Sequence, residues 1–117
     1  MLPKPLVAAS LKPIMLSLLA EGDMYGYQII HRVQELSGGQ IQWATSKLYP
    51  LLHRLEHEAL VEAYWQPSES GPKRKYYRLT PQGLKALEAS KRDWKVIHAI
   101  LTQLWGPDVS GWVVAPG

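Results

Sequence analysis

The first third of the chain carries leucine, isoleucine and methionine side chains at helical spacing, which predicts two helices separated by a glycine. We expect the first helix to run from about residue 10 to about residue 20, with Pro13 near its start and Gly22 as its stop. Asp23 can cap the second helix, and Gly38 can end it. The second helix should bury one apolar face, which comprises Tyr27, Ile30, Val33 and Leu36.

A third helix should begin at Thr45 or Ser46, either of which can cap it, and end near Ala59. Its leucines recur three or four positions apart and form an apolar face of Leu48, Leu51, Leu52 and Leu55. Pro50 removes one backbone hydrogen bond in the early turns, so we expect a bend there.

A hairpin and a long helix follow. The residues from Leu60 to Trp65 favour a strand, residues 67–72 form a turn-rich loop, and Lys75 to Leu79 predict the returning strand. Thr80 followed by Pro81 is typical of a helix start, and the last helix should run from about residue 81 to about residue 105. Residues 106–117 form a tail to which we assign no element.

The alternation of the returning strand separates two faces. Tyr77 and Leu79 should lie on the core face, whereas Tyr76, Arg74 and Arg78 lie on the other face, where they are available to a partner.

The last helix carries a seam that one chain cannot easily bury. Apolar side chains follow the alternating three and four spacing at Leu87, Trp94, Ile97, Leu101 and Leu104, with Ser90 interrupting the series between the first two. This spacing is typical of a coiled coil and predicts a homodimer that pairs through the first and last helices. We also assign Met15 of the first helix to this interface.

Composition narrows the class of protein. The chain has 117 residues, enough for one core, and a net charge of +3, which suits a nucleic-acid partner. It contains no cysteine, which excludes disulfides, thiol catalysis and thiolate metal sites. No apolar run is long enough to span a bilayer, and the N-terminus has no signal-peptide pattern, so we expect a cytoplasmic protein without a membrane partner.

The third helix and the hairpin carry the candidate DNA contacts. In a helix-turn-helix, the second helix of the pair enters the major groove and its first residues reach the base edges. Here those residues are Thr45, Ser46, Lys47 and Tyr49, with Arg54 further along for phosphate. A solvated polar face on a core helix would look the same. The hairpin favours DNA, because it concentrates basic residues suited to phosphates, Lys73, Arg74, Lys75 and Arg78, and Tyr76 on the same outer face as Arg74 is a further candidate DNA contact.

One catalytic signature is present in the third helix. His53, Glu56 and His57 spell H-x-x-E-H, in which two histidines four positions apart can share zinc. We interpret the match as coincidence, because a zinc enzyme needs a third ligand and a substrate cleft. No nucleophilic triad or phosphate loop is evident either, so we expect no enzyme, no metal and no cofactor.

The order of elements is typical of one fold. We predict a mainly α protein with a small β-hairpin, in which residues 1–80 form a winged helix-turn-helix DNA-binding domain and residues 81–105 form a dimerisation helix.

The chain also resembles the PadR-like transcriptional regulators over about residues 10 to 105, especially the short members with a single C-terminal helix. The resemblance rests on Leu48-Tyr49-Pro50 leading into Arg54-Leu55-Glu56, on Lys75 through Thr80 with Gly83, and on Tyr25-Gly26-Tyr27. It implies a homodimeric repressor that binds a palindromic operator and is released by a small molecule.

Three positions bear on how far the resemblance extends. Trp94 matches a tryptophan with which multidrug-sensing members sandwich flat aromatic ligands, although an indole packing on its mate in the seam is an equal alternative. Lys47 replaces a usual threonine and Ala59 replaces a usual turn glycine, so the operator sequence is not transferable. The rival hypothesis is a winged-helix module that binds another protein and has no specific DNA site.

Overall fold

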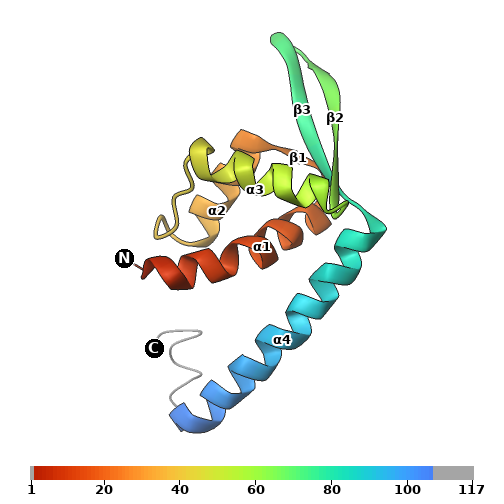
Figure 1. The fold of residues 1–117 in the computed structure, drawn as a ribbon. Coiled ribbons are helices and arrows are strands. Elements are labelled where there is room, and N and C mark those ends of the chain that lie inside the picture. The colour runs from red at the N-terminus through yellow and green to blue at the C-terminus, as the bar shows by residue number, and fades with distance from the viewer. Residues whose placement is uncertain (1, 107–117) are drawn as a thin grey trace. The chain divides into compact units, whose positions relative to one another are not determined.

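The computed structural model describes residues 2–106. Their elements are α1 (Lys4–Glu21), β1 (Met24–Tyr25), α2 (Gly26–Leu36), α3 (Thr45–His57), β2 (Val61–Ser68), β3 (Gly71–Leu79) and α4 (Pro81–Trp105) (Figure 1). The chain divides into two compact units, Met1–Leu87 and Glu88–Gly117, so that α4 begins in the first and continues into the second. The expected mainly α class with a small β-hairpin is confirmed, and β1 adds a third strand that the sequence did not predict.

Helix α1 starts earlier than the sequence suggested. It begins at Lys4 rather than near residue 10, and Pro13 lies inside it instead of near its start. The prediction was wrong because Pro5 stands in the first turn, where a missing N–H group leaves no hydrogen bond unmade. Further along, the Ser17 hydroxyl donates to the Pro13 carbonyl at 2.7 Å.

Helix α2 also differs from its prediction. A short strand, β1, precedes it, so the cap is Tyr25 rather than Asp23, and the Tyr25 N–H donates to the Gln28 side chain at 3.1 Å. The expected apolar face is rotated, because Tyr27 and Leu36 are 62% and 59% exposed. The buried residues are Gly26, Ile29 and Val33. The spacing of apolar residues in α2 allowed either of two neighbouring faces to be buried. Because α3 approaches closely at Gly26, the face that contains Gly26 is the buried one.

Helix α3 has the predicted span and buries the four predicted leucines. It ends at His57, and its cap is Ala44, so neither Thr45 nor Ser46 uses its side chain in capping. Ala59 then has a φ of 63°, a left-handed conformation that glycine adopts without the strain a Cβ brings. The chain therefore places an unfavourable residue at the turn into β2.

The sheet has the strand order β1-β3-β2, and both pairings are antiparallel. Strands β2 and β3 extend well past the predicted loop boundaries, which leaves only residues 69–70 between them. The expected loop over residues 67–72 was therefore too long: Pro67 and Pro72 lie within the strands near a register shift, where a proline interrupts few ladder bonds. As Figure 1 shows, this hairpin projects beyond α2 and α3.

One apolar core holds the first unit together. It comprises Met15, Leu16, Leu18, Leu19, Ile29, Val33, Trp43, Leu48, Leu51, Leu52, Leu55, Val61, Tyr77 and Leu87. Met15 has no exposed surface. The assignment of Met15 to a ligand or dimer interface was therefore wrong, because helical spacing shows an apolar face without showing what covers it.

The start of α4 is tied to the turn before β2. The Thr80 hydroxyl accepts a hydrogen bond from the Gly83 N–H at 3.0 Å and donates one to the Ala59 carbonyl at 2.6 Å. A Cβ at Gly83 would collide with the Leu60 carbonyl oxygen, so only glycine fits here. The predicted helix start at Thr80-Pro81 is confirmed.

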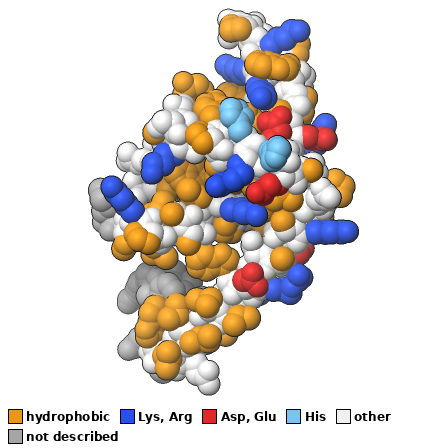
Figure 2. Space-filling view, in the orientation of Figure 1, with side chains coloured by type: hydrophobic (Ala, Val, Ile, Leu, Met, Phe, Trp, Pro, Cys, Tyr) orange, Lys and Arg blue, Asp and Glu red, His pale blue; other side chains and the backbone are white. Residues whose placement is uncertain are grey.

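The second unit consists of the rest of α4 in the described residues, and its apolar side chains are open to solvent. Exposed large side chains follow one another along it: Trp94, Val96, Ile97, Ile100, Leu104 and Trp105. Figure 2 shows hydrophobic side chains gathered on this helix. The predicted seam residues Trp94, Ile97 and Leu104 are 40%, 49% and 75% exposed, whereas Leu101 is half-buried.

Candidate nucleic-acid interface

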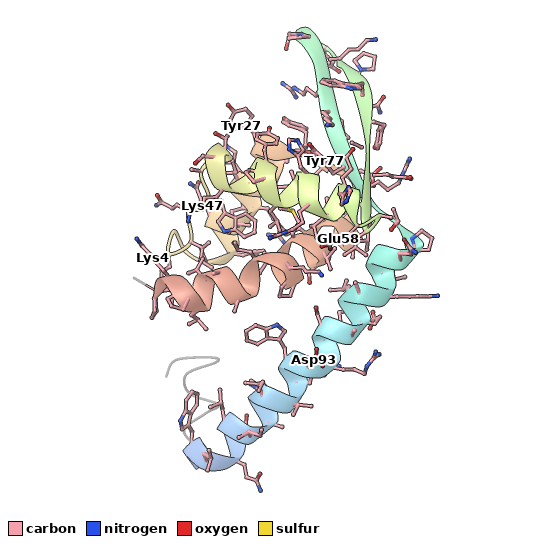
Figure 3. The ribbon with its side chains drawn as sticks, viewed as in Figure 1. Lys4, Tyr27, Lys47, Glu58, Tyr77 and Asp93 are labelled. Atoms are coloured by element: carbon pink, nitrogen blue, oxygen red, sulfur yellow. The ribbon has the colours of Figure 1, made fainter. Side chains whose placement is uncertain are left out.

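The first turn of α3 is polar and open. Thr45, Ser46 and Lys47 are all exposed, and Leu48 directly after them turns into the core. Figure 3 shows Lys47 at the beginning of the helix. Since the cap is made without the Thr45 and Ser46 hydroxyls, both hydroxyls remain available to an external partner.

Tyr49 is half-buried and links α3 to α2. Its phenol end occupies the space that a side chain at position 26 would fill, so Gly26 is what lets the two helices approach this closely. The His53 ring lies one turn further along, with its centroid 6.5 Å from that of Tyr49. Tyr49 therefore packs α3 closely against α2 and is only partly accessible.

Three of the predicted cations have no anionic partner. In the part of the chain that the structure describes, no carboxylate lies within ion-pair distance of Lys47, Arg54 or Lys73, and all three are exposed. Unpaired surface cations keep their full charge available for phosphate.

Other basic residues of the hairpin are engaged within the chain. The Arg74 guanidinium donates to the Tyr25 hydroxyl at 2.9 Å and lies 4.6 Å from the centre of the Tyr25 ring. Arg78 pairs with Glu62 at 3.0 Å and covers the Tyr64 ring. These two arginines brace the sheet as well as carrying charge.

A stack of tyrosines crosses the outer face of the sheet. The Tyr76 ring lies between Tyr25 on β1, at 5.3 Å, and Tyr64 on β2, at 5.8 Å. The Tyr64 hydroxyl donates to the Asp23 carboxylate, which raises the Tyr64 pKa because the bond favours the protonated phenol. Tyr76 is thus packed by neighbours on both sides, and Asp23 holds β2 instead of capping α2.

The inner face of the hairpin borders a groove. The groove has a volume of about 730 Å³, and its lining is aromatic and basic: Tyr25, Gly26, Tyr27, Tyr49, His53, Trp65, Arg74, Lys75 and Tyr77. The Lys75 ammonium lies 4.0 Å from the Glu56 carboxylate and 5.6 Å from the centre of the Tyr77 ring. Lys75 is therefore the predicted hairpin residue that stands nearest to α3.

Tyr77 anchors the hairpin beside α3, as Figure 3 shows, and its side chain is fully buried. Burial, followed by the nearby Glu56 charge, raises the Tyr77 pKa to about 12. Its hydroxyl makes no hydrogen bond within residues 2–106, which costs stability because a buried polar group has lost its water.

The H-x-x-E-H match does not gather a metal site within the described residues. No group of three or more histidine, aspartate or glutamate side chains with the geometry for a metal occurs among residues 2–106. Among the same residues, no helix is both long and apolar enough to cross a bilayer.

Sequence reasoning missed several residues around this surface. It did not find β1, the tyrosine stack or the place of Tyr27 and Trp65 in the groove. Counting by twos along β2 from the buried Val61 would have placed Trp65 on the inner face. Tyr27 could not be found that way, because its exposure follows from the rotation of α2.

The sequence pattern of the PadR-like transcriptional regulators matches residues 15–89, which is more than half of the chain. This chain belongs to the PadR-like family. The match covers α2, α3, the hairpin and the start of α4, so it includes the candidate interface.

Solved structures of bacterial transcriptional regulators, one of them PadR-like, have the same fold. A PadR-like transcriptional regulator from Bacillus cereus is 28% identical, with a TM-score of 0.77, and the alignment covers 87% of this chain and 97% of that one. A transcriptional regulator from Clostridium thermocellum is 27% identical, with a TM-score of 0.76, over 86% and 97% of the two chains. The winged-helix prediction is thereby confirmed.

Two proteins resemble this chain in sequence. An uncharacterised protein from Lysinibacillus sphaericus is 32% identical over 82% of this chain and 88% of its own length. The transcriptional regulator YqjI of Escherichia coli is 28% identical over 75% of this chain, but the alignment spans only 41% of YqjI. The chain is a DNA-binding transcriptional regulator and not an enzyme, as its family and structural neighbours indicate.

Proposed function

We propose that this PadR-like regulator is a ligand-responsive repressor that binds a palindromic operator as a homodimer. The first turn of α3, Thr45 to Lys47, reads base edges, with Tyr49 beside it, and Arg54 contacts phosphate. The hairpin, through Lys73, Lys75 and the braced Arg74 and Tyr76, grips the flanking backbone. The observation that carries this assignment is the set of unpaired, exposed cations on α3 and the hairpin.

The exposed stripe of α4 supports the dimer. Trp94, Ile97 and Leu104 leave much of their apolar surface in water, and a second copy with the same stripe would cover it. Pairing would present two α3 helices to successive major grooves about 34 Å apart, which is one DNA turn. A palindromic site matches such a two-fold protein.

Trp94 is the proposed effector contact. Its indole is 40% exposed on the stripe, so a flat aromatic molecule held between two copies could stack on it. Such a ligand would change the spacing of the two α3 helices. The protein would then release its operator, because both half-sites can be bound together at only one spacing. Quenching of tryptophan fluorescence by aromatic ligands, lost in Trp94→Phe, is the expected signature.

Salt-dependent DNA binding tests the assignment of the DNA face. We would titrate the protein into labelled duplexes, one of random sequence and one from upstream of its own coding region, at several salt concentrations. Lys47→Ala and Lys73→Ala should each weaken binding to both and reduce the salt slope by about one, because each removes one released counterion.

Lys12→Ala is the matched control, since it removes the same charge from α1, where Lys12 already pairs with Glu58 at 3.7 Å. Its slope should equal that of the unaltered protein. If neither duplex binds at low salt, the stripe on α4 would be better explained as a docking site for another protein, and the rival hypothesis would replace this one.

A further inference from the structure

Two aromatic side chains on the candidate DNA face are unusually open. Tyr27 and Trp65 are 62% and 60% exposed, the highest values among the exposed aromatic side chains of residues 2–106. Both line the groove between α3 and the hairpin. Figure 3 shows Tyr27 pointing outward from α2. The groove therefore presents apolar rings, and not only charge, to whatever lies in it.

The strand geometry explains why Trp65 faces the groove. Val61, Ala63 and Trp65 share one face of β2, and their partners on β3 are Leu79, Tyr77 and Lys75. Val61 is buried, Ala63 packs against the core, and Trp65 lies beyond the core on the projecting part of the hairpin. The inner face thus continues from the core into the groove, where Trp65 stands opposite Lys75.

The chemistry of the lining indicates what the groove can hold. Arg74 and Lys75 contribute cations, Lys75 beside the Glu56 carboxylate, and no carboxylate of residues 2–106 belongs to the lining itself. A DNA strand offers a repeating pair of groups that fits such a surface: anionic phosphates and the apolar faces of deoxyribose rings. Apolar side chains are common partners of DNA where a protein grips the backbone or the minor groove.

We propose that Trp65 is a DNA contact that packs its indole against the deoxyribose of a strand lying in this groove. The hairpin then binds through an apolar contact as well as through cations, and the apolar part does not weaken with salt because it releases no counterion. This inference rests on the DNA face proposed above. It adds a residue that lies outside the basic cluster and names the part of DNA that it touches.

Substitution of Trp65 separates the apolar contact from the electrostatic one. Trp65→Ala should weaken binding to a random-sequence duplex by roughly tenfold, the scale of losing one aromatic contact with nucleic acid. Its salt slope should remain unchanged, whereas Lys73→Ala should reduce the slope by about one. Trp65→Phe should recover most of the affinity, because a smaller ring keeps part of the contact.

Circular dichroism melting of each variant checks that the fold is intact; since Trp65 is largely exposed, we expect little change. If Trp65→Ala binds the duplex as tightly as the unaltered protein, the inference is overturned. A reduced salt slope in Trp65→Ala would also overturn it. So would tighter binding of a single strand than of the duplex, because the groove would then stack bases.

Acrylamide quenching of tryptophan fluorescence gives a direct readout. Saturating random-sequence duplex should protect part of the fluorescence of the unaltered protein from acrylamide, and this protection should be smaller in Trp65→Phe. The Trp105→Phe variant is the control, and it should keep the full protection. Equal protection in the unaltered protein and Trp65→Phe contradicts the inference while leaving the proposed function intact. Absence of duplex binding by the unaltered protein would instead overturn the proposed function itself.

Discussion

The two units of this chain differ in how far they bury their apolar side chains. The first unit, Met1–Leu87, encloses a core in which Leu16, Ile29 and Leu52 have no exposed surface. In the second, residues 91–100 are all exposed, although Ile97 and Ile100 are as apolar as any core residue. A similar periodicity therefore has two outcomes: a helix that packs within its own chain, and a helix whose apolar stripe stays exposed within the described residues.

The difference has a simple physical origin. Residues of the first unit meet neighbours from several elements, and tyrosine and arginine contacts brace the sheet on its outer face. Within the described residues the second unit is a single helix, and a single helix cannot bury its own stripe. Changes in the first unit should therefore alter folding, and changes on the stripe should alter association.

The largest expected effect is in the first unit. Gly83→Ala places a Cβ against the Leu60 carbonyl oxygen, which is backbone and cannot move aside cheaply. We expect a loss of about 3 kcal/mol in the free energy of unfolding, at the upper end of overpacking effects. Urea denaturation followed by circular dichroism measures it. Gly22→Ala is the control, since nothing lies within 4 Å of its Cβ; equal losses in the two variants would contradict the account.

In the second unit, Ile97→Glu should weaken the association of two copies of the chain. A carboxylate on the stripe would be buried without a partner in a dimer, so we expect a dimer weakened by roughly 2 kcal/mol or more, the cost of losing an interface hot spot. The urea midpoint of the first unit should change little. Sedimentation velocity over a concentration series measures the shift. Lys95→Glu, two positions earlier and also exposed, is the control for adding a carboxylate to this helix.

Tyr77→Phe tests how much stability the buried Tyr77 hydroxyl costs the first unit. The variant removes a buried hydroxyl that has no hydrogen bond within the described residues, so we expect a gain of about 1 kcal/mol near pH 7. The pH dependence should change too. Because the Tyr77 pKa is raised to about 12 in the folded chain, the unfolded chain ionises first, and stability falls as pH rises from about 10 towards 12.

That alkaline loss should be smaller in Tyr77→Phe, as measured by urea denaturation at a series of pH values. Tyr76→Phe serves as the comparison, because its phenol is on the opposite face of β3. An identical pH dependence of stability in Tyr77→Phe and the unaltered protein would show that Tyr77 is not the buried group responsible.

The smallest expected effect is at the turn before β2. Ala59→Gly relieves a left-handed alanine but adds freedom to the unfolded chain, so we expect a net gain of about 0.5 kcal/mol. Thermal melting measures the gain. The gain should be absent in Ala44→Gly, where the φ of −83° is ordinary. No gain in Ala59→Gly would mean that the neighbouring Thr80 bond fixes this turn regardless of the residue.

The sequence predicted those elements for which the hydrophobic spacing and the residues at the ends indicate the same helix or strand. Helix α3 has four leucines at helical spacing and a clear stop, and α4 begins at Thr80-Pro81, so both helices were found. The alternation around Tyr77 also placed the correct face of β3 in the core. In each case a local signal and the tertiary contacts favour the same conformation.

Elements set by distant contacts could not be predicted. The strand β1 exists because Met24 and Tyr25 pair with Tyr77 and Tyr76, which lie far along the chain. The bracing role of Arg74 depends on Tyr25 in the same way, so composition showed a cation without its partner. Met15 failed for a related reason, since an apolar residue on a helix can face the core or an interface.

The mass of the protein on DNA tests most directly the proposal that two copies act together through the α4 stripe. Sedimentation equilibrium of the protein alone, and with a labelled duplex from upstream of its own coding region, gives both masses. The account predicts two chains in the free protein and two chains on each duplex, with Ile97→Glu losing both. A protein that is one chain when free and binds the duplex as one chain would contradict it.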